Sequence, residues 1–269
     1  MSKVDDAMNQ TTIDEAYRRL DSAYTNKQSI APLTRTFPNL DIHEAYQVQL
    51  KTIQNWESHG GTIVGKKIGL TSLAMQQLLG VDQPDYGHLL KSMEEIEETP
   101  VSLDALFQPK AEGEIAFVLK KDLKGPNVTT ADVMEATDYI APAIEIVDSR
   151  IKDWEITLPD TIADNASCGR YVLGKKKLEL TQEIDLAEIE MNLYKNGMLI
   201  NEGSGKDVLG NPATCVAWLA NALSEHGIGL HAGEVILSGA LSAAVEVGND
   251  DTIHCAFSTL GTVEATFKA

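Results

Sequence analysis

The sequence predicts an α+β protein built on a largely antiparallel or mixed sheet. Three observations predict this class. Segments typical of strands dominate the chain, several of them are separated by hairpin-like turns, and the few helical segments do not alternate with strands as βαβ units would. With 269 residues, the chain is long enough for one large domain, or for one domain with a small appendage.

The N-terminal part of the chain is predicted to be helical. Apolar residues at helical spacing mark a first amphipathic helix over residues 13–24. A second helix begins after Asp41, which forms the pattern of a capping box with Glu44, and ends near Gly60. We therefore expect a helical segment over residues 1–61 and a second, strand-rich unit over residues 62–269.

After residue 62 the predicted elements are mostly strands. Lys195-Asn196-Gly197 is typical of a hairpin turn, and Asn211-Pro212 of the N-cap and first turn of a helix that runs to about residue 223. A short helix is expected over residues 72–79. The expected strands cover residues 63–70, 115–119, 188–193, 198–200, 235–237, 252–257 and 262–267.

Composition excludes several classes of function. The formal net charge of −18 opposes binding to nucleic acid or to an anionic membrane surface. The sequence contains no apolar run near the ~20 residues that span a bilayer and no apolar signal segment at its start, so we expect a cytoplasmic protein. The three cysteines are widely spaced, as expected in a reducing compartment without disulfides or a zinc site.

The pair Glu112 and Glu114 is the most informative feature of the chain. Both precede the apolar run 115–119, so they should share one face of a strand, roughly 7 Å apart at Cα. Two carboxylates this close repel unless a cation neutralises them, and oxygen ligands favour Mg²⁺, Mn²⁺ or Ca²⁺. The alternative is a solvated strand face that carries two glutamates without a function.

Lys66 and Lys67 lie within an apolar strand-like run, GKKIGLTS. Because neighbouring strand residues point to opposite faces, at most one of the two can reach a given site. A lysine in a dry pocket can act as an acid, a base or an anion anchor. In the alternative interpretation both ammonium groups extend to solvent.

Other polar residues also lie in apolar or turn-rich surroundings. Glu145 falls within the run PAIEIV, where a carboxylate is unusual unless it is paired or ligates a metal. Asp148 and Arg150 follow it and could form a structural ion pair. Further candidates come from the loop around Asp85 and His88 and from the glycine-rich segments 201–212 and 237–242, whose backbone N–H groups could bind a carboxylate. No phosphate-loop or dinucleotide fingerprint and no nucleophile elbow is present.

Seven motifs in this order resemble the 2-oxopent-4-enoate hydratases of the fumarylacetoacetate hydrolase superfamily: GKKIGLTS, VDQPDYGHLL, PKAEGEIAFVL, PAIEIVDSR, DTIADNASCG, GNPATCVAWLAN and GEVILSGALS. The resemblance runs from about Gly65 to the C-terminus. It implies a mixed β-sheet roll of the C-terminal-domain type of that superfamily, so that residues 62–269 would be the catalytic domain. It also implies a metal site, with Mg²⁺ or Mn²⁺ bound by Glu112, Glu114 and Glu145.

The resemblance further implies the roles of six other residues. Lys67 and Asp85 are the expected catalytic residues, and the expected substrate-binding residues are Leu70, Ser167, Ser238 and Gly239. The expected reaction adds water to 2-hydroxypenta-2,4-dienoate and gives 4-hydroxy-2-oxopentanoate, in the catabolism of aromatic compounds. The small anionic substrate would be neutralised locally by the cation and Lys67.

Four alternatives stay open on the sequence alone. They are a 4-oxalocrotonate decarboxylase, a 2-oxohept-4-ene-1,7-dioate hydratase, an acylpyruvate-type hydrolase and a non-catalytic partner subunit. A diacid substrate would need a further cation in the pocket, and the sequence does not place Arg150 or Arg170. A hydrolase would need a His–Glu dyad, for which His88 is the histidine near a motif. The resemblance also implies a homo-oligomer that could associate with a related decarboxylase or with the downstream aldolase.

Overall fold

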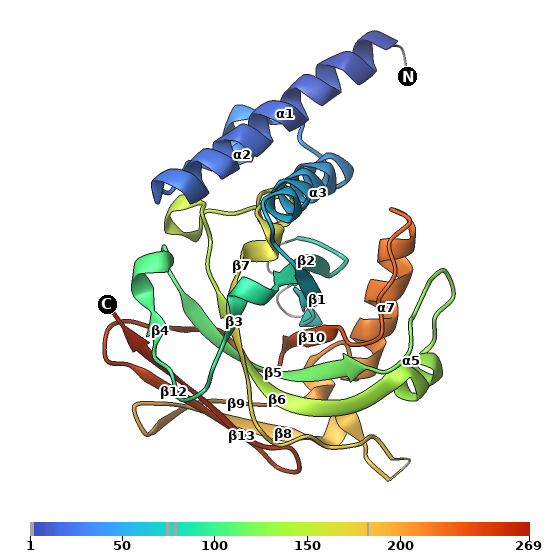
Figure 1. Ribbon diagram of the computed structural model, residues 1–269, viewed down its shortest axis with the longest axis vertical. Helices are drawn as coiled ribbons and strands as arrows, with labels where there is room; N and C mark the ends of the chain where they lie inside the picture. The colour runs from blue at the N-terminus through green and yellow to red at the C-terminus, as the bar shows by residue number, and fades with distance from the viewer. Residues whose placement is uncertain (1–2, 74–75, 78–79, 182) are drawn as a thin grey trace.

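Two sheets form the frame of the protein in the computed structural model (Figure 1), which describes residues 3–73, 76–77, 80–181 and 183–269. The eight-stranded sheet has the order β2-β1-β10-β5-β6-β7-β3, with β11 also paired to β5. Its strands are β1 (Ile63–Gly69), β2 (Asp85–Leu90), β3 (Glu94–Glu95), β5 (Lys110–Leu119), β6 (Thr137–Val147), β7 (Cys168–Leu173), β10 (Val235–Ala240) and β11 (Val245–Glu246). The expected α+β class with a mixed sheet is confirmed.

The second sheet has five strands in the order β4-β13-β12-β8-β9. They are β4 (Val101–Ser102), β8 (Glu190–Lys195), β9 (Met198–Ser204), β12 (Thr252–Phe257) and β13 (Gly261–Lys268). This sheet packs against one face of β5, where a Cβ on Gly113 would lie 3.0 Å from Cys255 Sγ and from the Met191 side chain. The absence of a side chain at Gly113 therefore lets the two sheets approach closely.

The helices gather at the edges of this frame, with α1, α2 and α3 together at one end (Figure 1). Their bounds are α1 Lys3–Asn26, α2 Leu33–Thr36, α3 Ile42–Ser58, α5 Thr130–Ala136, α6 Leu158–Ala163 and α7 Pro212–Ser224. Short 3₁₀ turns cover Lys91–Met93, Leu103–Ala105, Lys152–Trp154, Asn165–Ser167, Leu186–Glu188 and Gly205–Asp207. None of the described helices is long and apolar enough to cross a membrane.

Helix α3 joins the helical segment to the large sheet. Asp41 and Glu44 form the predicted capping box at its start. Near its middle, Gln49 Nε2 donates to the carbonyl oxygens of Tyr86 in β2 and Ile162 in α6, both at 2.8 Å. Near its end, Trp56 packs on an apolar cluster that includes Ala116 and Ala143. These contacts attach the helical segment to the large sheet at its β2 edge. The division at residue 61 stays a prediction.

Most predicted elements match the structure, with differences at their ends. The hairpin turn is present, with positive φ at Asn196 (53°) and Gly197 (80°), as a two-residue turn of this type requires. The predicted strand 63–70 ends at Gly69, because Leu70 has a left-handed backbone with φ of 55°. The predicted helix 72–79 includes residues outside the described part of the chain.

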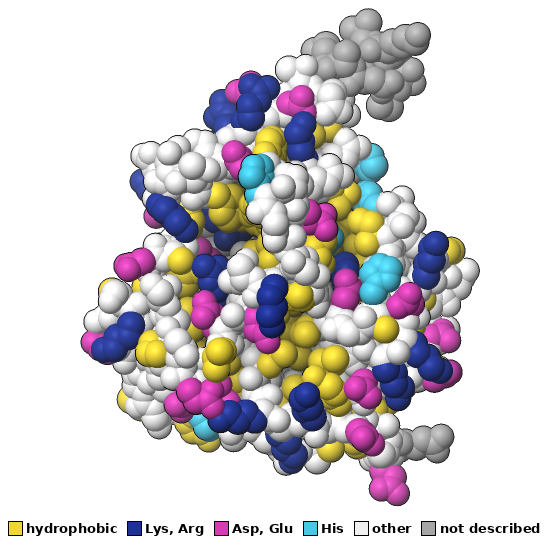
Figure 2. Space-filling view, in the orientation of Figure 1, with side chains coloured by type: hydrophobic (Ala, Val, Ile, Leu, Met, Phe, Trp, Pro, Cys, Tyr) yellow, Lys and Arg dark blue, Asp and Glu magenta, His cyan; other side chains and the backbone are white. Residues whose placement is uncertain are grey.

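Figure 2 shows acidic and basic side chains interspersed on one face, around a central apolar area.

Candidate active site and metal centre

Three glutamates meet on neighbouring strands of the large sheet. Glu112 and Glu114 point to the same face of β5, and the register pairs Glu112 directly with Glu145 of β6. One oxygen from each of the three carboxylates lies within 4.8 Å of the others. Glu114 and Glu145 are fully buried, whereas Glu112 is half-buried. The two motifs that the sequence offered separately thus form one cluster.

The carboxylates of this cluster destabilise one another in the charged form. Burial, together with the charge of Glu145, raises the pKa of Glu112 to about 7, although Lys67 opposes the rise. Burial and the same neighbouring charges raise the pKa of Glu114 well above its usual range. The pKa of Glu145 is also raised by burial, and Lys67 again opposes the rise. A buried anionic cluster of this kind calls for a cation.

The oxygen atoms of the cluster fit a divalent cation. Glu114 Oε1 and both carboxylate oxygens of Glu145 are buried and accept no hydrogen bond within the described residues. The other oxygen of Glu114, Oε2, accepts a hydrogen bond from the Gly239 N–H at 2.8 Å, which fixes the orientation of that carboxylate. Free, buried and converging carboxylate oxygens are the ligands that Mg²⁺, Mn²⁺ and Ca²⁺ prefer.

Lys67 lies beside the glutamates at the centre of the site. Its Nζ is 3.3 Å from Glu145 Oε1 and donates to the Ala166 carbonyl oxygen at 3.0 Å. Burial acts to lower the pKa of this ammonium group, but the charges of Glu145, Asp85 and Glu112 outweigh burial and raise it. Lys67 therefore stays protonated and provides a positive charge next to the carboxylates.

Asp85 approaches the site from β2 through a space left by a glycine. Gly69 pairs with Asp85 in the antiparallel register, and a Cβ at Gly69 would lie 2.2 Å from Asp85 Oδ1 and 3.3 Å from Lys67 Nζ. Asp85 Oδ1 is buried without a hydrogen-bond partner among the described residues, and Oδ2 accepts a long hydrogen bond of 3.5 Å from Thr161. Burial raises the pKa of Asp85 while Lys67 opposes the rise, so this carboxyl is suited to proton exchange.

Ser167 belongs to an unusual turn. Asn165, Ala166 and Ser167 all have left-handed backbones, with φ of 55°, 49° and 53°. Each non-glycine residue in this region costs about 1–2 kcal/mol, so surrounding contacts must hold the turn in place. The Ser167 hydroxyl lies 3.1 Å from Thr161 Oγ1, which itself contacts Asp85. Through this chain of contacts Ser167 reaches the site indirectly.

The other three predicted binding residues lie close to the carboxylates in different ways. Leu70 lines the pocket described below. The Ser238 hydroxyl donates to the Ile115 carbonyl oxygen at 2.8 Å, so it already has a partner within the sheet. Gly239 has a left-handed φ of 112° and directs its N–H to Glu114. A Cβ at Gly239 would lie 2.3 Å from Thr71 Oγ1, so no larger side chain fits there.

A pocket of about 620 Å³ leads from the surface to the half-buried Glu112. Its wall is largely apolar, with acidic residues near β9. Among the described residues, its lining contains no lysine or arginine and consists of Ile68, Gly69, Leu70, Thr71, Ser72, Glu112, Asn201, Glu202, Asp207, Ala240, Leu241, Ser242, Ala243 and Ala244. The pocket can therefore hold a small, partly apolar molecule next to the carboxylate cluster.

Lys66 and His88 lie on the opposite face of the sheet. Lys66 Nζ pairs with Glu234 Oε1 at 2.5 Å, and both lysines of the pair 66–67 are buried. Neither lysine extends to solvent, because each has an acidic partner on its own face. His88 contacts Gln49 at 3.2 Å, and burial with the nearby Lys66 lowers its pKa to about 3.

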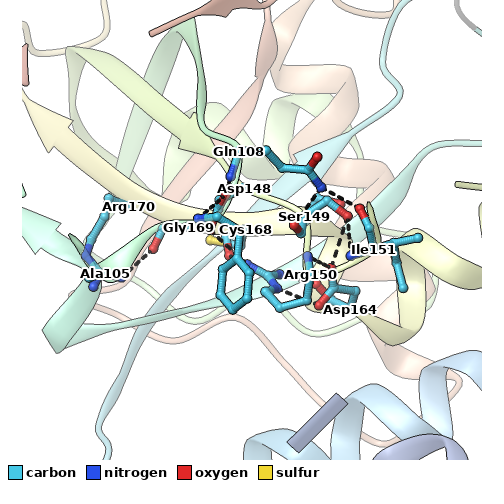
Figure 3. A network of polar contacts seen from close by, with 12 residues as sticks. Ala105, Gln108, Asp148, Ser149, Arg150, Ile151, Asp164, Cys168, Gly169 and Arg170 are labelled. Carbon is cyan, nitrogen blue, oxygen red and sulfur yellow. Dashed lines mark hydrogen bonds and ion pairs between the residues drawn. The ribbon is translucent and has the colours of Figure 1, made fainter. Parts of the chain in front are cut away.

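Arg150 has its own buried network with Asp148 and Asp164 (Figure 3), so the predicted structural ion pair is present.

Some residues of the site were not found from the sequence. Thr161, Gly69 and the carbonyl oxygen of Ala166 contribute space or hydrogen bonds rather than a charged group. Glu202 of β9 lines the pocket although it is about ninety positions from the glutamate pair. The sequence offered one signal for these residues, the glycine at position 69. A glycine within a strand often marks a place where a ligand or another part of the chain approaches the backbone closely.

Comparison with known proteins agrees with this geometry. Residues 89–268 match the family described as fumarylacetoacetate (FAA) hydrolase C-terminal. A 2-hydroxyhexa-2,4-dienoate hydratase from Comamonas testosteroni is 46% identical over 257 residues, which cover 95% of this chain and 97% of the relative. A 2-hydroxypent-2,4-dienoate hydratase from Pseudomonas putida is 46% identical over 223 residues, which cover 82% of this chain and all of the relative.

Among solved structures, 4-oxalocrotonate decarboxylase from Pseudomonas putida G7, complexed with magnesium and adipate, superposes with a TM-score of 0.92. The two sequences are 36% identical, and the match covers 96% of this chain and 98% of that one. Both a hydratase and a decarboxylase sequence are thus similar to this chain, so the fold alone does not select the reaction.

Proposed function

Because the chain belongs to the fumarylacetoacetate hydrolase family, and within it to the 2-keto-4-pentenoate hydratases, we propose that it is a hydro-lyase. It adds water to 2-hydroxypenta-2,4-dienoate and forms 4-hydroxy-2-oxopentanoate in the catabolism of aromatic compounds. One observation carries the proposal. Three carboxylates converge beside Lys67, and the two that are fully buried have oxygens without a hydrogen-bond partner. The third, Glu112, lines a pocket whose described lining contains no lysine or arginine.

Glu112, Glu114 and Glu145 would hold the divalent cation, Mg²⁺ or Mn²⁺. A cation bound there supplies positive charge that stabilises developing negative charge on the C2 oxygen of a 2-oxo acid. The magnesium named in the complex of the decarboxylase supports this assignment. The identity of the ion in this chain is part of the proposal.

Lys67 and Asp85 would handle the protons. The substrate is a dienol, which must lose the proton of its 2-hydroxyl group and gain one at C5 before water can add to C4. Asp85 Oδ1, which is buried and unpartnered, accepts the hydroxyl proton, and the Lys67 ammonium delivers a proton to C5. The added water then supplies the hydroxyl group at C4 and a proton at C3, so the product contains one molecule of water more than the substrate. Transfer of the proton from Asp85 to Lys67 restores both groups for the next turnover.

Leu70 would line the pocket through which the substrate enters. Gly239 would orient Glu114 through its N–H, and Ser238 would hold β10 against β5 through its hydrogen bond to the β5 backbone. Ser167 would act through Thr161 on Asp85. Each of these residues positions a group that faces the substrate. The four assignments extend the expectation from the sequence and stay predictions.

The lining of the pocket supports a monocarboxylate substrate over a dicarboxylate. A second carboxylate at the outer end would meet Glu202 and Asp207 and would find no lysine or arginine among the described lining residues. Neither arginine considered from the sequence lines this pocket. Arg150 is engaged with Asp164, and Arg170 with Glu95. This observation argues against both the decarboxylase and the dioate hydratase.

The position of His88 argues against the hydrolase. That reaction needs a histidine and a glutamate that together activate water beside the metal. His88 lies on the sheet face opposite to the three glutamates, and its pKa of about 3 reflects burial near Lys66. Within the described residues, the site therefore combines carboxylates and a lysine, which suits proton transfer on a dienol.

We further propose that the chain forms a homo-oligomer. Met198, Leu199 and Ile200 are exposed in a row on β9, the outer strand of the five-stranded sheet, which supports contact with another surface. Light scattering that gives a stable 29 kDa monomer at micromolar concentration would contradict the oligomer. Association with a related decarboxylase or the downstream aldolase, and a cytoplasmic location, stay predictions.

The test of the proposed function offers two substrates to the purified protein with Mg²⁺ or Mn²⁺. Hydration removes the ultraviolet absorbance of 2-hydroxypenta-2,4-dienoate, whereas release of CO₂ from 2-oxohex-3-enedioate marks decarboxylation. We expect hydration of the dienoate and no release of CO₂. Release of CO₂ without hydration of the dienoate would replace this proposal with the decarboxylase.

A further inference from the structure

The side chain of Arg150 is fully buried. Figure 3 shows its guanidinium group within a network of polar contacts that includes Asp164 and Cys168. Its Nε donates to Asp164 Oδ1 at 2.6 Å, its second terminal nitrogen to the Asp164 carbonyl oxygen at 2.7 Å, and its first to the Cys168 carbonyl oxygen at 3.0 Å. The guanidinium group contacts none of the three glutamates in these hydrogen bonds. Any effect on the reaction must therefore pass through the backbone that it holds.

The two carbonyl groups lie on either side of the left-handed turn Asn165–Ser167. Asp164 precedes the turn and Cys168 follows it, so one rigid planar cation connects both ends. The Asp148 N–H adds a third constraint, because it donates to the Ser167 carbonyl oxygen at 2.7 Å. Several non-glycine residues in the left-handed region persist only where surrounding contacts determine the conformation. Arg150 supplies two of those contacts.

The turn Asn165–Ser167 also holds polar groups of the site in position. The Ala166 carbonyl oxygen accepts the hydrogen bond from Lys67 Nζ at 3.0 Å, and the Ser167 hydroxyl contacts Thr161, which contacts Asp85. If the turn relaxed, Lys67 would lose the acceptor that sets the direction of its ammonium group. The three glutamates on β5 and β6 would keep their cross-strand register.

We propose that Arg150 is a positioning residue for the hydration reaction, because it holds the left-handed turn that orients Lys67 toward the substrate. This inference rests on the proposed function. A shift of about 1 Å in a catalytic group can lower a rate on the order of 10²-fold, whereas the binding of metal and substrate by the glutamates does not depend on the turn.

The experiment compares Arg150→Lys and Arg150→Ala with the wild-type chain. Lysine keeps the charge beside Asp164 but cannot serve both carbonyl groups at once, so the variant should fold and lose kcat by on the order of 10–100-fold. Its KM and its affinity for Mn²⁺ should stay within about twofold of wild type, since the glutamates keep their places. Guanidinium at millimolar concentration should restore part of the kcat of Arg150→Ala, because a pocket of about 310 Å³ lies beside Arg150.

Arg170→Lys is the matched control. Arg170 lines the same pocket, but its donors reach Gly169 and Glu95 and neither end of the turn, so we expect the wild-type kcat. A folded Arg150→Lys variant with the wild-type kcat would overturn the inference. An equal loss of Mn²⁺ affinity, or no rescue of folded Arg150→Ala, would assign Arg150 a purely structural role.

A crystal structure of Arg150→Lys tests the positioning without any substrate. The distance from Lys67 Nζ to the Ala166 carbonyl oxygen should exceed hydrogen-bond range, about 3.5 Å. An unchanged distance would refute the inference. A wild-type chain that does not hydrate the dienoate would instead refute the proposed function, and the crystallographic result would still decide the role of Arg150 in holding the turn.

Discussion

At the scale of single residues, the neighbouring lysines 66 and 67 have different surroundings. Strand β1 directs Lys67 to the carboxylate cluster and Lys66 to Glu234 on the other face. Both ammonium groups are buried, so each depends on its acidic partner. Two adjacent positions thus place one lysine beside the proposed metal site and the other in a separate buried ion pair.

Replacement of each lysine by methionine should give opposite results. Lys67→Met should lower kcat/KM by on the order of 10²-fold or more, because a proton donor beside the substrate is lost. Lys66→Met should keep the wild-type kcat/KM, measured on the folded fraction. The reverse pattern would mean that β1 presents the other face to the site.

The same two variants should differ in stability. Lys66→Met leaves Glu234 buried without its cation, so the free energy of unfolding in urea should fall by about 3 kcal/mol. Adding Glu234→Gln should recover most of this loss, because the remaining charge is removed. A double variant no more stable than Lys66→Met would show that the ion pair is not the cause.

His88 should make the protein sensitive to acid. Its pKa falls from 6.5 to about 3 because burial and Lys66 oppose its protonation. The unfolded chain therefore binds a proton that the folded chain does not, and stability is lost as the pH falls below 6.5. Between pH 7 and pH 5 this amounts to about 2 kcal/mol. His88→Asn keeps a donor toward Gln49 but has no group that titrates in this range. Between pH 7 and pH 5 its free energy of unfolding should therefore fall by about 2 kcal/mol less than that of the wild type. An equal pH dependence in both proteins would contradict this account of His88.

Residue patterns predicted the charged part of the site. Glu112, Glu114 and Glu145 were recognisable because carboxylates are rare in apolar strands. The strand pattern allowed only one of Lys66 and Lys67 to face the site, and the choice of Lys67 came from the family resemblance. The burial of Lys66 was not predictable, since its partner Glu234 is far away in the sequence and joins it only when β10 pairs with β1.

At the scale of elements, the site depends on the close pairing of β1 and β2. Gly69 has no side chain where Asp85 crosses toward Lys67. Gly69→Ala should displace Asp85 and lower kcat/KM by on the order of 10²-fold, while the thermal midpoint changes little. Gly248→Ala is the control, because its Cβ would lie 3.7 Å from Asp251 and should alter neither quantity. Wild-type kinetics in Gly69→Ala would show that the position of Asp85 is not critical.

Elements that are determined by residues close together in the sequence could be predicted, whereas elements that depend on distant residues could not. The capping box at Asp41 and the Asn196-Gly197 hairpin turn are determined by short-range hydrogen bonds and backbone preferences. The left-handed turn 165–167 has no glycine to announce it. Arg150 and Asp148, which lie outside the turn, hold its ends, and the Asn165 side chain binds the His88 backbone.

At the scale of the whole molecule, we expect the net charge and the pocket lining to favour a monocarboxylate substrate. The net charge of −18 and the acidic outer end of the pocket oppose dianions. We expect wild-type kcat/KM for the monocarboxylate dienoate to exceed that for a dicarboxylate analogue by on the order of 10²-fold. Glu202→Lys should reduce this preference by roughly tenfold, since reversing one exposed charge changes the interaction by about 1–2 kcal/mol.

Glu264→Lys tests whether any change in net charge has the same effect. Glu264 lies on β13 in the same sheet as Glu202 and is not part of the pocket lining. The preference for the monocarboxylate should stay at its wild-type value in this variant. If both variants shifted the preference equally, long-range charge rather than the pocket would be responsible.

The order of the strands could not be read from the sequence. Strand β1 pairs in parallel with β10, about 170 positions later, and this pairing brings Lys67 next to the strand that carries Gly239. Long-range pairings of this kind depend on the packing of the whole sheet. The α+β class could be predicted because it follows from the local pattern of strands and helices.

The most direct test of the central claim is a titration of the metal-free protein with Mn²⁺, in which bound metal and hydration of the dienoate are followed together. We predict one bound ion per wild-type chain, with activity rising in proportion to occupancy. Glu114→Gln should keep the fold, bind no Mn²⁺ at the same concentrations and show no hydration, because the site loses one of its three carboxylates. Full activity of wild-type protein in the presence of EDTA, or wild-type Mn²⁺ binding by Glu114→Gln, would contradict the claim that these three glutamates form the metal centre of the enzyme.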